Sequence, residues 1–258
     1  MIARIGAWVD RRGVGDDWER WLNIAKRVGL TDVSLVLHGQ DAGKPFDPFT
    51  LPHRAARIVR AYAAAGIAPH VMLWPQPRRS HAEALLTYVR DLHALCEGTL
   101  ASAEIDVEEQ WTRSAWRPVL GAAVTRQLRD GWPQGLPMAA NGITAALPKF
   151  VALASVADAL IPQAYTSTHK GQGSEPGARQ HAVAAAWAKH LKPGTELVMG
   201  LAAYGQEGAG GFRAQAAMAL AFGAASEHAS RVMYWSLPDL ASGAAGAFVT
   251  ARCKELSR

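Results

Sequence analysis

Residues 102–108 of the sequence read Ser-Ala-Glu-Ile-Asp-Val-Glu, and this stretch decides between two possible folds. Glu104, Asp106 and Glu108 occupy every second position, with aliphatic residues between them. Successive side chains of a β-strand point to opposite faces, so the three carboxylates share one face and the aliphatic side chains share the other. Such a strand has one face for packing against helices and one charged face that needs a different environment.

Around this strand, β-rich runs alternate with longer, alanine-rich amphipathic segments along the whole chain. This alternation predicts repeated β-α units, and eight of them can be counted. The predicted strands are Arg4–Val9, Asp32–Leu37, Ala68–Trp74, Ser102–Glu108, Leu136–Asn141, Ala159–Tyr165, Glu196–Tyr204 and Arg231–Ser236. The predicted helices lie near Asp17–Val28, Pro52–Ala65, His81–Cys96, Ser114–Asp130, Ala145–Ser155, Gln180–Leu191, Gly211–Glu227 and Ser242–Glu255. Glycines that favour a left-handed cap follow several of these helices, at Gly29, Gly66, Gly131 and Gly194.

The carboxylate strand favours a closed barrel over an open, doubly wound sheet, which would fit the same alternation. In a barrel the aliphatic face packs against helices, and the carboxylates point inward near the C-terminal end of the strands, where barrel enzymes carry their sites. We therefore predict an α/β fold, a single (β/α)8 TIM barrel that takes in residues 1–258 as one domain.

The composition fits a protein with a full core, because 49% of its 258 residues are hydrophobic and 19% are charged. No apolar run reaches about 18 residues, and the N-terminus lacks the apolar core of a signal peptide. We expect no membrane partner, synthesis in the cytoplasm, and release to the cell wall in a phage-lysis-like role. Cys96 and Cys253 are far apart in sequence and predict no disulfide framework. We expect a monomer.

The net charge is +5, from 27 Lys and Arg against 22 Asp and Glu, and the pI is near 9.4. Such a balance suits an anionic polymer such as cell wall or nucleic acid, but a solvated basic surface explains it equally well. The basic residues do not cluster, and no nucleic-acid motif is recognised, so we expect no nucleic-acid partner.

Inward-pointing carboxylates are costly, and this cost suggests a chemical use. Neighbouring carboxylates have pKa values that are pushed apart, because the charge of the group that ionises first opposes ionisation of the next. A carboxyl group that stays protonated can donate its proton to a glycosidic oxygen, while an ionised neighbour stabilises positive charge on the sugar. Glu108, the furthest along the strand, is the predicted general acid. The competing interpretation is a buried ion-pair network in which Arg or Lys from a neighbouring strand neutralises the carboxylates.

Residues 101–108 also resemble the D-x-x-D-x-D-x-E signature of glycoside hydrolase family 18, the family of chitinases and endo-β-N-acetylglucosaminidases. Glu108 falls on the proton donor of that signature, and Asp106 on the aspartate that orients the acetamido group of the substrate. Glu104 replaces an aspartate, and Ala101 replaces the first aspartate. The resemblance implies a retaining mechanism in which the N-acetyl oxygen of the substrate attacks the anomeric carbon, so that no enzyme nucleophile is needed.

Three later segments extend the resemblance in the right order along the chain. Residues 197–205 resemble the seventh-strand pattern of the family and place Tyr204 beside the site. Residues 232–237 resemble its eighth strand, in which Trp235 would form the floor of a sugar subsite. Residues 162–165 stand in place of the sixth-strand M-x-Y-D motif, with Tyr165 on the tyrosine that binds the acetamido group and Thr166 at the aspartate position.

Two alternatives remain. Ile105–Glu108 is also similar to the D-x-E strand of family 25 muramidases, and residues 163–167 resemble their W-Q-Y-T-S segment, although two further β-α units follow it here. The changes at Ala101 and Glu104 are compatible with a catalytically silent, carbohydrate-binding barrel. Both families act on N-acetylated amino-sugar polymers, and peptidoglycan is the favoured substrate because the short segment Gln206–Ser230 implies an open groove.

The other candidate residues lie at predicted strand ends. The complete set of substrate-binding candidates is Trp235, Tyr204, Gln163, Trp74, Trp111, Asn141 and Asp10. Ordinary packing explains Trp74 and Trp111 equally well, and turn formation is the alternative for Asn141 and Asp10. The nine histidines show no H-x-x-x-H pair or Cys/His clustering, so we predict no metal site and no cofactor.

Overall fold

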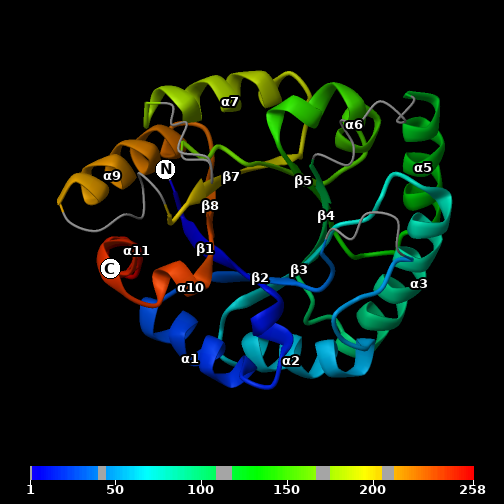
Figure 1. Ribbon diagram of the computed structural model, residues 1–258, viewed down its shortest axis with the longest axis horizontal. Coiled ribbons are helices and arrows are strands. Elements are labelled where there is room, and N and C mark those ends of the chain that lie inside the picture. The colour runs from blue at the N-terminus through cyan, green and yellow to red at the C-terminus, as the bar shows by residue number, and fades with distance from the viewer. Residues whose placement is uncertain (1, 40–44, 109–117, 167–174, 205–211) are drawn as a thin grey trace.

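The computed structural model describes residues 2–39, 45–108, 118–166, 175–204 and 212–258 (Figure 1). Its eight strands pair in parallel in chain order, and the last strand pairs with the first to close a barrel. The strands are β1 (Arg4–Val9), β2 (Asp32–Val36), β3 (Ala68–Leu73), β4 (Ser102–Val107), β5 (Met138–Gly142), β6 (Ala159–Pro162), β7 (Glu196–Ala202) and β8 (Arg231–Trp235). The predicted (β/α)8 fold class is confirmed.

Helices surround the barrel on all sides (Figure 1). They are α1 (Trp18–Val28), α2 (Pro52–Ala64), α3 (Arg79–Cys96), α5 (Pro118–Gly131), α6 (Leu147–Ala154), α7 (Ala178–Ala188), α9 (Phe212–Ser226), α10 (Leu237–Leu240) and α11 (Gly243–Leu256), with 3-10 helices η1 (Arg11–Val14) and η2 (Thr144–Ala146). None of the helices in these described ranges is long and apolar enough to cross a lipid bilayer.

Most strands end earlier than their sequence pattern predicts. The predicted strands included Trp74, Glu108, Tyr165 and Tyr204, but each of these residues lies beyond the last residue of its strand. A residue past the last ladder hydrogen bond is released from the pleat, so its side chain can turn toward the mouth of the barrel. These candidate site residues therefore lie at the C-terminal rim of the barrel, and not in its wall as predicted.

Glycines at helix ends follow the prediction with one exception. Gly29, Gly66 and Gly194 have φ angles of 85°, 77° and 87°, the left-handed conformation that glycine adopts without steric cost. Gly131 instead is the last residue of α5, and a Cβ atom there would lie 2.6 Å from Cδ1 of Leu86 on α3. Glycine at this position allows close packing of α5 on α3 rather than a cap.

The interior of the barrel contains a small apolar cluster, which is separate from the larger core between strands and helices. Its buried members are Trp8, Val36, Met72, Ala139, Ala159, Ile161, Val198 and Met233. Trp8 is fully buried, and a Cβ atom on Gly200 of β7 would lie 3.2 Å from its ring. Glycine at position 200 therefore gives the Trp8 indole room to lie inside the barrel.

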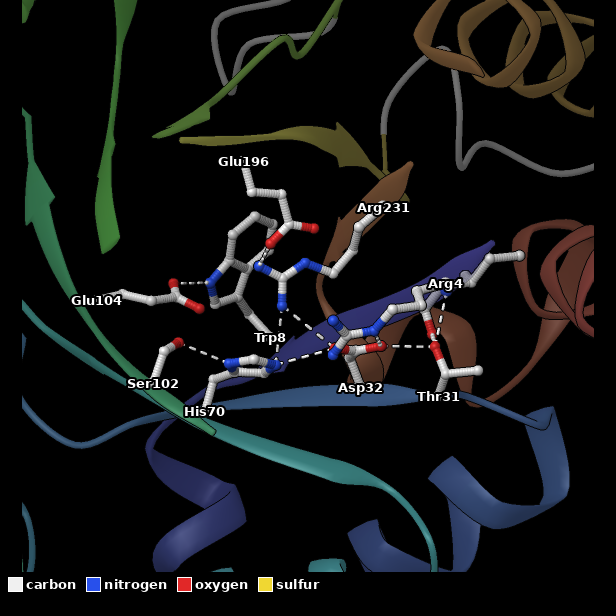
Figure 2. A network of polar contacts seen from close by, with 10 residues as sticks. Arg4, Trp8, Thr31, Asp32, His70, Ser102, Glu104, Glu196 and Arg231 are labelled. Atoms are coloured by element: carbon white, nitrogen blue, oxygen red, sulfur yellow. Dashed lines mark hydrogen bonds and ion pairs between the residues drawn. The ribbon is translucent and has the colours of Figure 1, made fainter. Parts of the chain in front are cut away.

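A charged layer fills the N-terminal end of the barrel, and we call it the N-terminal polar layer. It comprises Arg4, Thr31, Asp32, His70, Ser102, Glu196 and Arg231 (Figure 2). Asp32 is fully buried at its centre and pairs with Arg4, with Nε2 of His70 at 2.9 Å and with Nη1 of Arg231 at 3.2 Å. Burial alone would raise the pKa of Asp32, but the contacts with His70, Thr31 and Arg4 hold it well below its ordinary value. This carboxylate therefore stays ionised inside the barrel.

Candidate functional site

β4 carries three carboxylates toward the C-terminal end of the barrel. Glu104 and Asp106 are 1% and 2% exposed, whereas Glu108, which directly follows the strand, is half-buried. Ile105 and Val107 are fully buried in the core between strands and helices, so the alternation read from the sequence is realised in the structure. The three acids therefore lie in a row that runs from the barrel interior to its rim.

Glu104 lies deepest and is held by neutral donors. The indole nitrogen of Trp8 donates a hydrogen bond of 2.9 Å to Oε2 of Glu104, and Nδ2 of Asn141 approaches the same oxygen at 3.3 Å (Figure 2 shows the Trp8 contact). Trp8 and Asn141 thereby fix the position of the Glu104 side chain without a cationic partner.

A single side-chain amide connects the two upper carboxylates. Nε2 of Gln163, which follows β6, lies 2.8 Å from Oε1 of Glu108, 3.2 Å from Oδ1 of Asp106 and 3.3 Å from Oδ1 of Asn141. An amide nitrogen has two hydrogens, so at most two of these contacts are well-directed bonds, and the two carboxylates are the stronger acceptors. Gln163 therefore sets the position of Glu108 relative to Asp106.

Asp106 favours its protonated form. Burial raises its pKa well above the ordinary value, and repulsion from Glu108 and Glu104 raises it further, while hydrogen bonds from the Val107 backbone and Gln163 only partly oppose this. Because the charge of Glu108 raises the pKa of Asp106, the protonation states of the two groups depend on each other. Such a pair can donate a proton and take it back during a reaction.

Within the described residues, no arginine or lysine forms an ion pair with Glu104 or Asp106. The buried ion-pair network considered as an alternative does exist, but it lies around Asp32 at the opposite end of the barrel. The carboxylates of β4 therefore stay in an environment of neutral donors and apolar side chains. Their charges repel one another, which is the condition that splits pKa values.

Tyr165 joins this group from the segment after β6. Burial raises the pKa of its hydroxyl well above the ordinary value, and the neighbouring Tyr204 hydroxyl and the β4 carboxylates raise it further. The Tyr165 and Tyr204 rings meet edge to face with centroids 6.0 Å apart. Tyr165 is therefore a neutral hydrogen-bond donor near Glu108 and Asp106 at physiological pH.

Aromatic rings line the same end of the barrel. Trp235, at the end of β8, is half-buried, and its ring centroid lies 6.0 Å from that of Trp8. Trp74 follows β3, is half-buried, and has an indole nitrogen that is buried without a partner in the described residues. Half-buried indoles of this kind offer flat apolar surface for the faces of sugar rings.

The remaining predicted residues have different surroundings. Asp10 caps η1, where it accepts a hydrogen bond from the Arg12 backbone and pairs with the Arg12 guanidinium at 2.6 Å. Asn141 does not serve as a turn residue but contacts Glu104, as described above. Trp111 lies outside the described residues. Sequence reasoning missed the role of Trp8, because nothing in a strand sequence shows how far across the barrel an indole reaches.

No protein-family model matches the sequence, and no curated protein sequence matches it either. Its fold matches many solved structures. GH5_18-E140A from Bifidobacterium longum, in complex with Manβ1-4GlcNAc, matches with a TM-score of 0.73 and 10% identity over 98% of this chain and 78% of the other. A chitinase from Bacteroides thetaiotaomicron matches with a TM-score of 0.65 and 12% identity over 93% and 91% of the two chains.

A chitinase from Rhizomucor miehei matches with a TM-score of 0.59 and 12% identity over 98% of this chain and 99% of the other. At such identities the likeness establishes the barrel fold and leaves the chemistry to the residues of this chain.

Proposed function

We propose that this protein is a glycoside hydrolase that cleaves β-1,4 bonds of an N-acetylated amino-sugar polymer, with Glu108 as the general acid. The observation that carries the proposal is the Asp106–Gln163–Glu108 arrangement, in which one amide joins a rim carboxyl group to a buried, proton-retaining one. A general acid for glycoside cleavage has to hold a proton near neutral pH, and a proton shared with Asp106 supplies it.

The proposed reaction needs no carboxylate nucleophile. The proton of Glu108 passes to the glycosidic oxygen as the bond to the anomeric carbon breaks, and the carbonyl oxygen of the substrate's own acetamido group bonds to that carbon. The resulting cyclic oxazolinium ion loses charge as Asp106 accepts its nitrogen-bound proton. Water then attacks the anomeric carbon and gives a proton to Glu108, while the bond from that carbon to the acetamido oxygen breaks and Asp106 returns its proton to the nitrogen. These transfers restore Glu108 and the acetamido group, and the configuration is retained.

The neighbouring side chains fit supporting roles. The neutral Tyr165 hydroxyl would donate a hydrogen bond to the acetamido oxygen and hold it for attack. The half-buried ring of Trp235 would form the floor of the sugar subsite. This is the site that the resemblance to glycoside hydrolase family 18 implies, and the substrate-assisted mechanism rests on that resemblance.

Peptidoglycan is the substrate we favour. The net charge of +5 suits an anionic wall polymer. The segment between β7 and β8, which includes the helix α9, is too short to hold an additional domain. A short segment here favours an open groove, which suits an enzyme that acts within long or cross-linked chains. Two of the structural matches are described as chitinases, and a third is described in complex with a sugar that contains N-acetylglucosamine, so amino-sugar substrates recur on this fold.

Product analysis tests the proposal. Purified wild type and Glu108→Gln are incubated with peptidoglycan sacculi and with chitin oligomers, and the reducing ends are identified by mass spectrometry. We expect products from the wild type and a loss of about 10²–10⁴-fold in rate for the variant. Glu83→Gln, which removes an exposed carboxylate on α3, is the matched control and should keep the wild-type rate.

The identity of the reducing end separates the remaining alternatives. N-acetylglucosamine there supports the proposed enzyme, and N-acetylmuramic acid would assign a muramidase instead. If neither polymer gives a product that depends on Glu108, the proposal is wrong, and retention of sacculi by the intact protein would then favour the carbohydrate-binding barrel.

A further inference from the structure

A second group of reactive side chains lies on the outer ring of helices. His181 is in the first turn of α7, and Glu227 and His228 directly follow α9. One potential ligand atom from each of the three residues lies within 4.8 Å of the others. α7 and α9 pack side by side, which brings together residues that are 47 positions apart in the sequence (Figure 1).

The two imidazole rings already face each other through nitrogen atoms. Nδ1 of His181 and Nε2 of His228 are 2.8 Å apart, and the rings are nearly perpendicular at 83°. In a tetrahedral zinc site, Zn–N bonds of about 2.0–2.1 Å place two ligand nitrogens about 3.3 Å apart. The two nitrogens would therefore need to move apart by about half an ångström for an ion to take the place of the proton between them. Side chains at the surface make such a movement by small rotations.

We propose that His181, Glu227 and His228 form a binding site for a divalent transition-metal ion, with Zn²⁺ as the reference occupant. Two imidazoles and one carboxylate suit Zn²⁺, Ni²⁺ or Cu²⁺, whereas Ca²⁺ and Mg²⁺ prefer sites made of oxygen ligands. Three protein ligands leave room for water to complete the coordination. The spacing of histidines along the sequence gave no sign of this site, because its ligands come from two separate segments, the start of α7 and the residues after α9.

The position of the site suggests what the ion does. It would link the start of α7 to the residues that follow α9, two helices that contact each other. Gln180, the neighbour of His181, donates a 2.6 Å hydrogen bond to the carbonyl of Ala164, between Gln163 and Tyr165. The ion therefore stabilises the helix that anchors this segment, and it does so whether or not the barrel hydrolyses sugars.

Calorimetric titration of ZnCl₂ into untagged, chelator-treated protein tests the site. We expect one equivalent of Zn²⁺ to bind to the wild type and the His181→Ala/His228→Ala double variant to bind at least about 10-fold more weakly, since two of three ligands are lost. Glu227→Gln should weaken binding less. His190→Ala, two residues past the end of α7, is the control and should bind like the wild type.

Two further measurements make the result independent of activity and folding. Zn²⁺ should raise the Tm of the wild type but not of the double variant, because an ion bound only by the folded state stabilises it. Cu²⁺ bound to the wild type should show two nitrogen ligands by electron paramagnetic resonance. Wild type without saturable Zn²⁺ binding, or a folded double variant with unchanged affinity, would overturn the proposal.

Discussion

The indole nitrogen of Trp8 lies 2.9 Å from a carboxylate oxygen of Glu104, although 96 residues separate them in the sequence. This hydrogen bond spans the inside of the barrel and links the first strand to the strand that carries the acids. Glu104 receives a second, longer contact from Asn141 and no ion pair within the described residues. The buried Glu104 side chain therefore relies on this indole N–H group for its shortest hydrogen bond.

Trp8→Phe should destabilise the protein by about 1–3 kcal/mol through the loss of this bond, in addition to the cost of the smaller ring. A double-mutant cycle with Glu104→Met, which keeps the length of the side chain but removes the acceptor, separates the two effects, measured by urea unfolding of all four proteins. We expect a coupling free energy of about 1–3 kcal/mol. Additive effects of the two substitutions would show that the contact contributes nothing to stability.

Gln163→Glu should lower kcat/KM by about 100-fold or more at pH 7. The new carboxylate would replace a donor with an acceptor and repel both Asp106 and Glu108. The loss should grow as pH rises, since ionisation of the new group adds repulsion. The measurement is the rate of hydrolysis, across pH 4–9, of whichever polymer the wild type cleaves. Gln163→Met removes the hydrogen bonds but adds no charge, so it should lose less activity and its loss should depend less on pH. A pH profile equal to that of the wild type for Gln163→Glu would refute the bridging role.

Asp106→Asn should raise the Tm at neutral pH while it lowers activity. The pKa of Asp106 is higher in the folded protein than its ordinary value of 3.8, so the folded state is favoured when this group is protonated and loses that advantage as pH rises. Folding at neutral pH requires the Asp106 carboxyl group to take up a proton that the unfolded chain has released, and a neutral amide avoids this cost. We expect a rise of a few degrees, because about 1 kcal/mol shifts the Tm of a protein of this size by about 2–4 °C. The Tm gain should shrink toward pH 4, where the carboxyl group begins to be protonated in the unfolded chain as well.

Asp32→Asn should have the opposite effect on stability. The pKa of Asp32 is lowered in the folded state, so its contribution is complete above the ordinary value of 3.8 and is lost as pH falls below it. At pH 7 the variant removes the buried carboxylate that Arg4, His70 and Arg231 contact, and it should lose about 3–5 kcal/mol although Arg231 keeps its pair with Glu196. Asp130→Asn, which breaks an exposed pair with Arg129, should cost less than about 1 kcal/mol. Equal losses in both variants would show that burial of the network is irrelevant.

The sequence predicted the parts of the site that lie on one strand. Alternation alone placed Glu104, Asp106 and Glu108 on one face, and this charged face, together with the repeated β-α units, predicted the closed barrel. The partners of these acids could not be predicted in the same way. Asn141 looked like a turn residue, and its contact with Glu104 arises from the pairing of neighbouring strands β4 and β5.

Contacts across the barrel or between helices could not be predicted from the sequence, for a physical reason. The reach of Trp8 depends on the space left at Gly200, and the approach of His181 to His228 depends on the packing of α7 on α9. Neither is a property of local spacing. The role of Gln163 lies between these cases. It was recognised as a candidate substrate-binding residue, but its bridge between two carboxylates was not predicted.

The N-terminal polar layer also bears on how the chain assembles during its synthesis. Asp32 is made 199 residues before Arg231, its partner on the final strand. A nascent chain that has formed only its first seven β-α units would enclose an acid whose neutralisation is incomplete, with the edges of β1 and β7 still unpaired. Arrival of β8 supplies the missing cation and both missing strand neighbours in one event. Completion of the barrel should therefore be cooperative, and partly assembled forms should be short-lived.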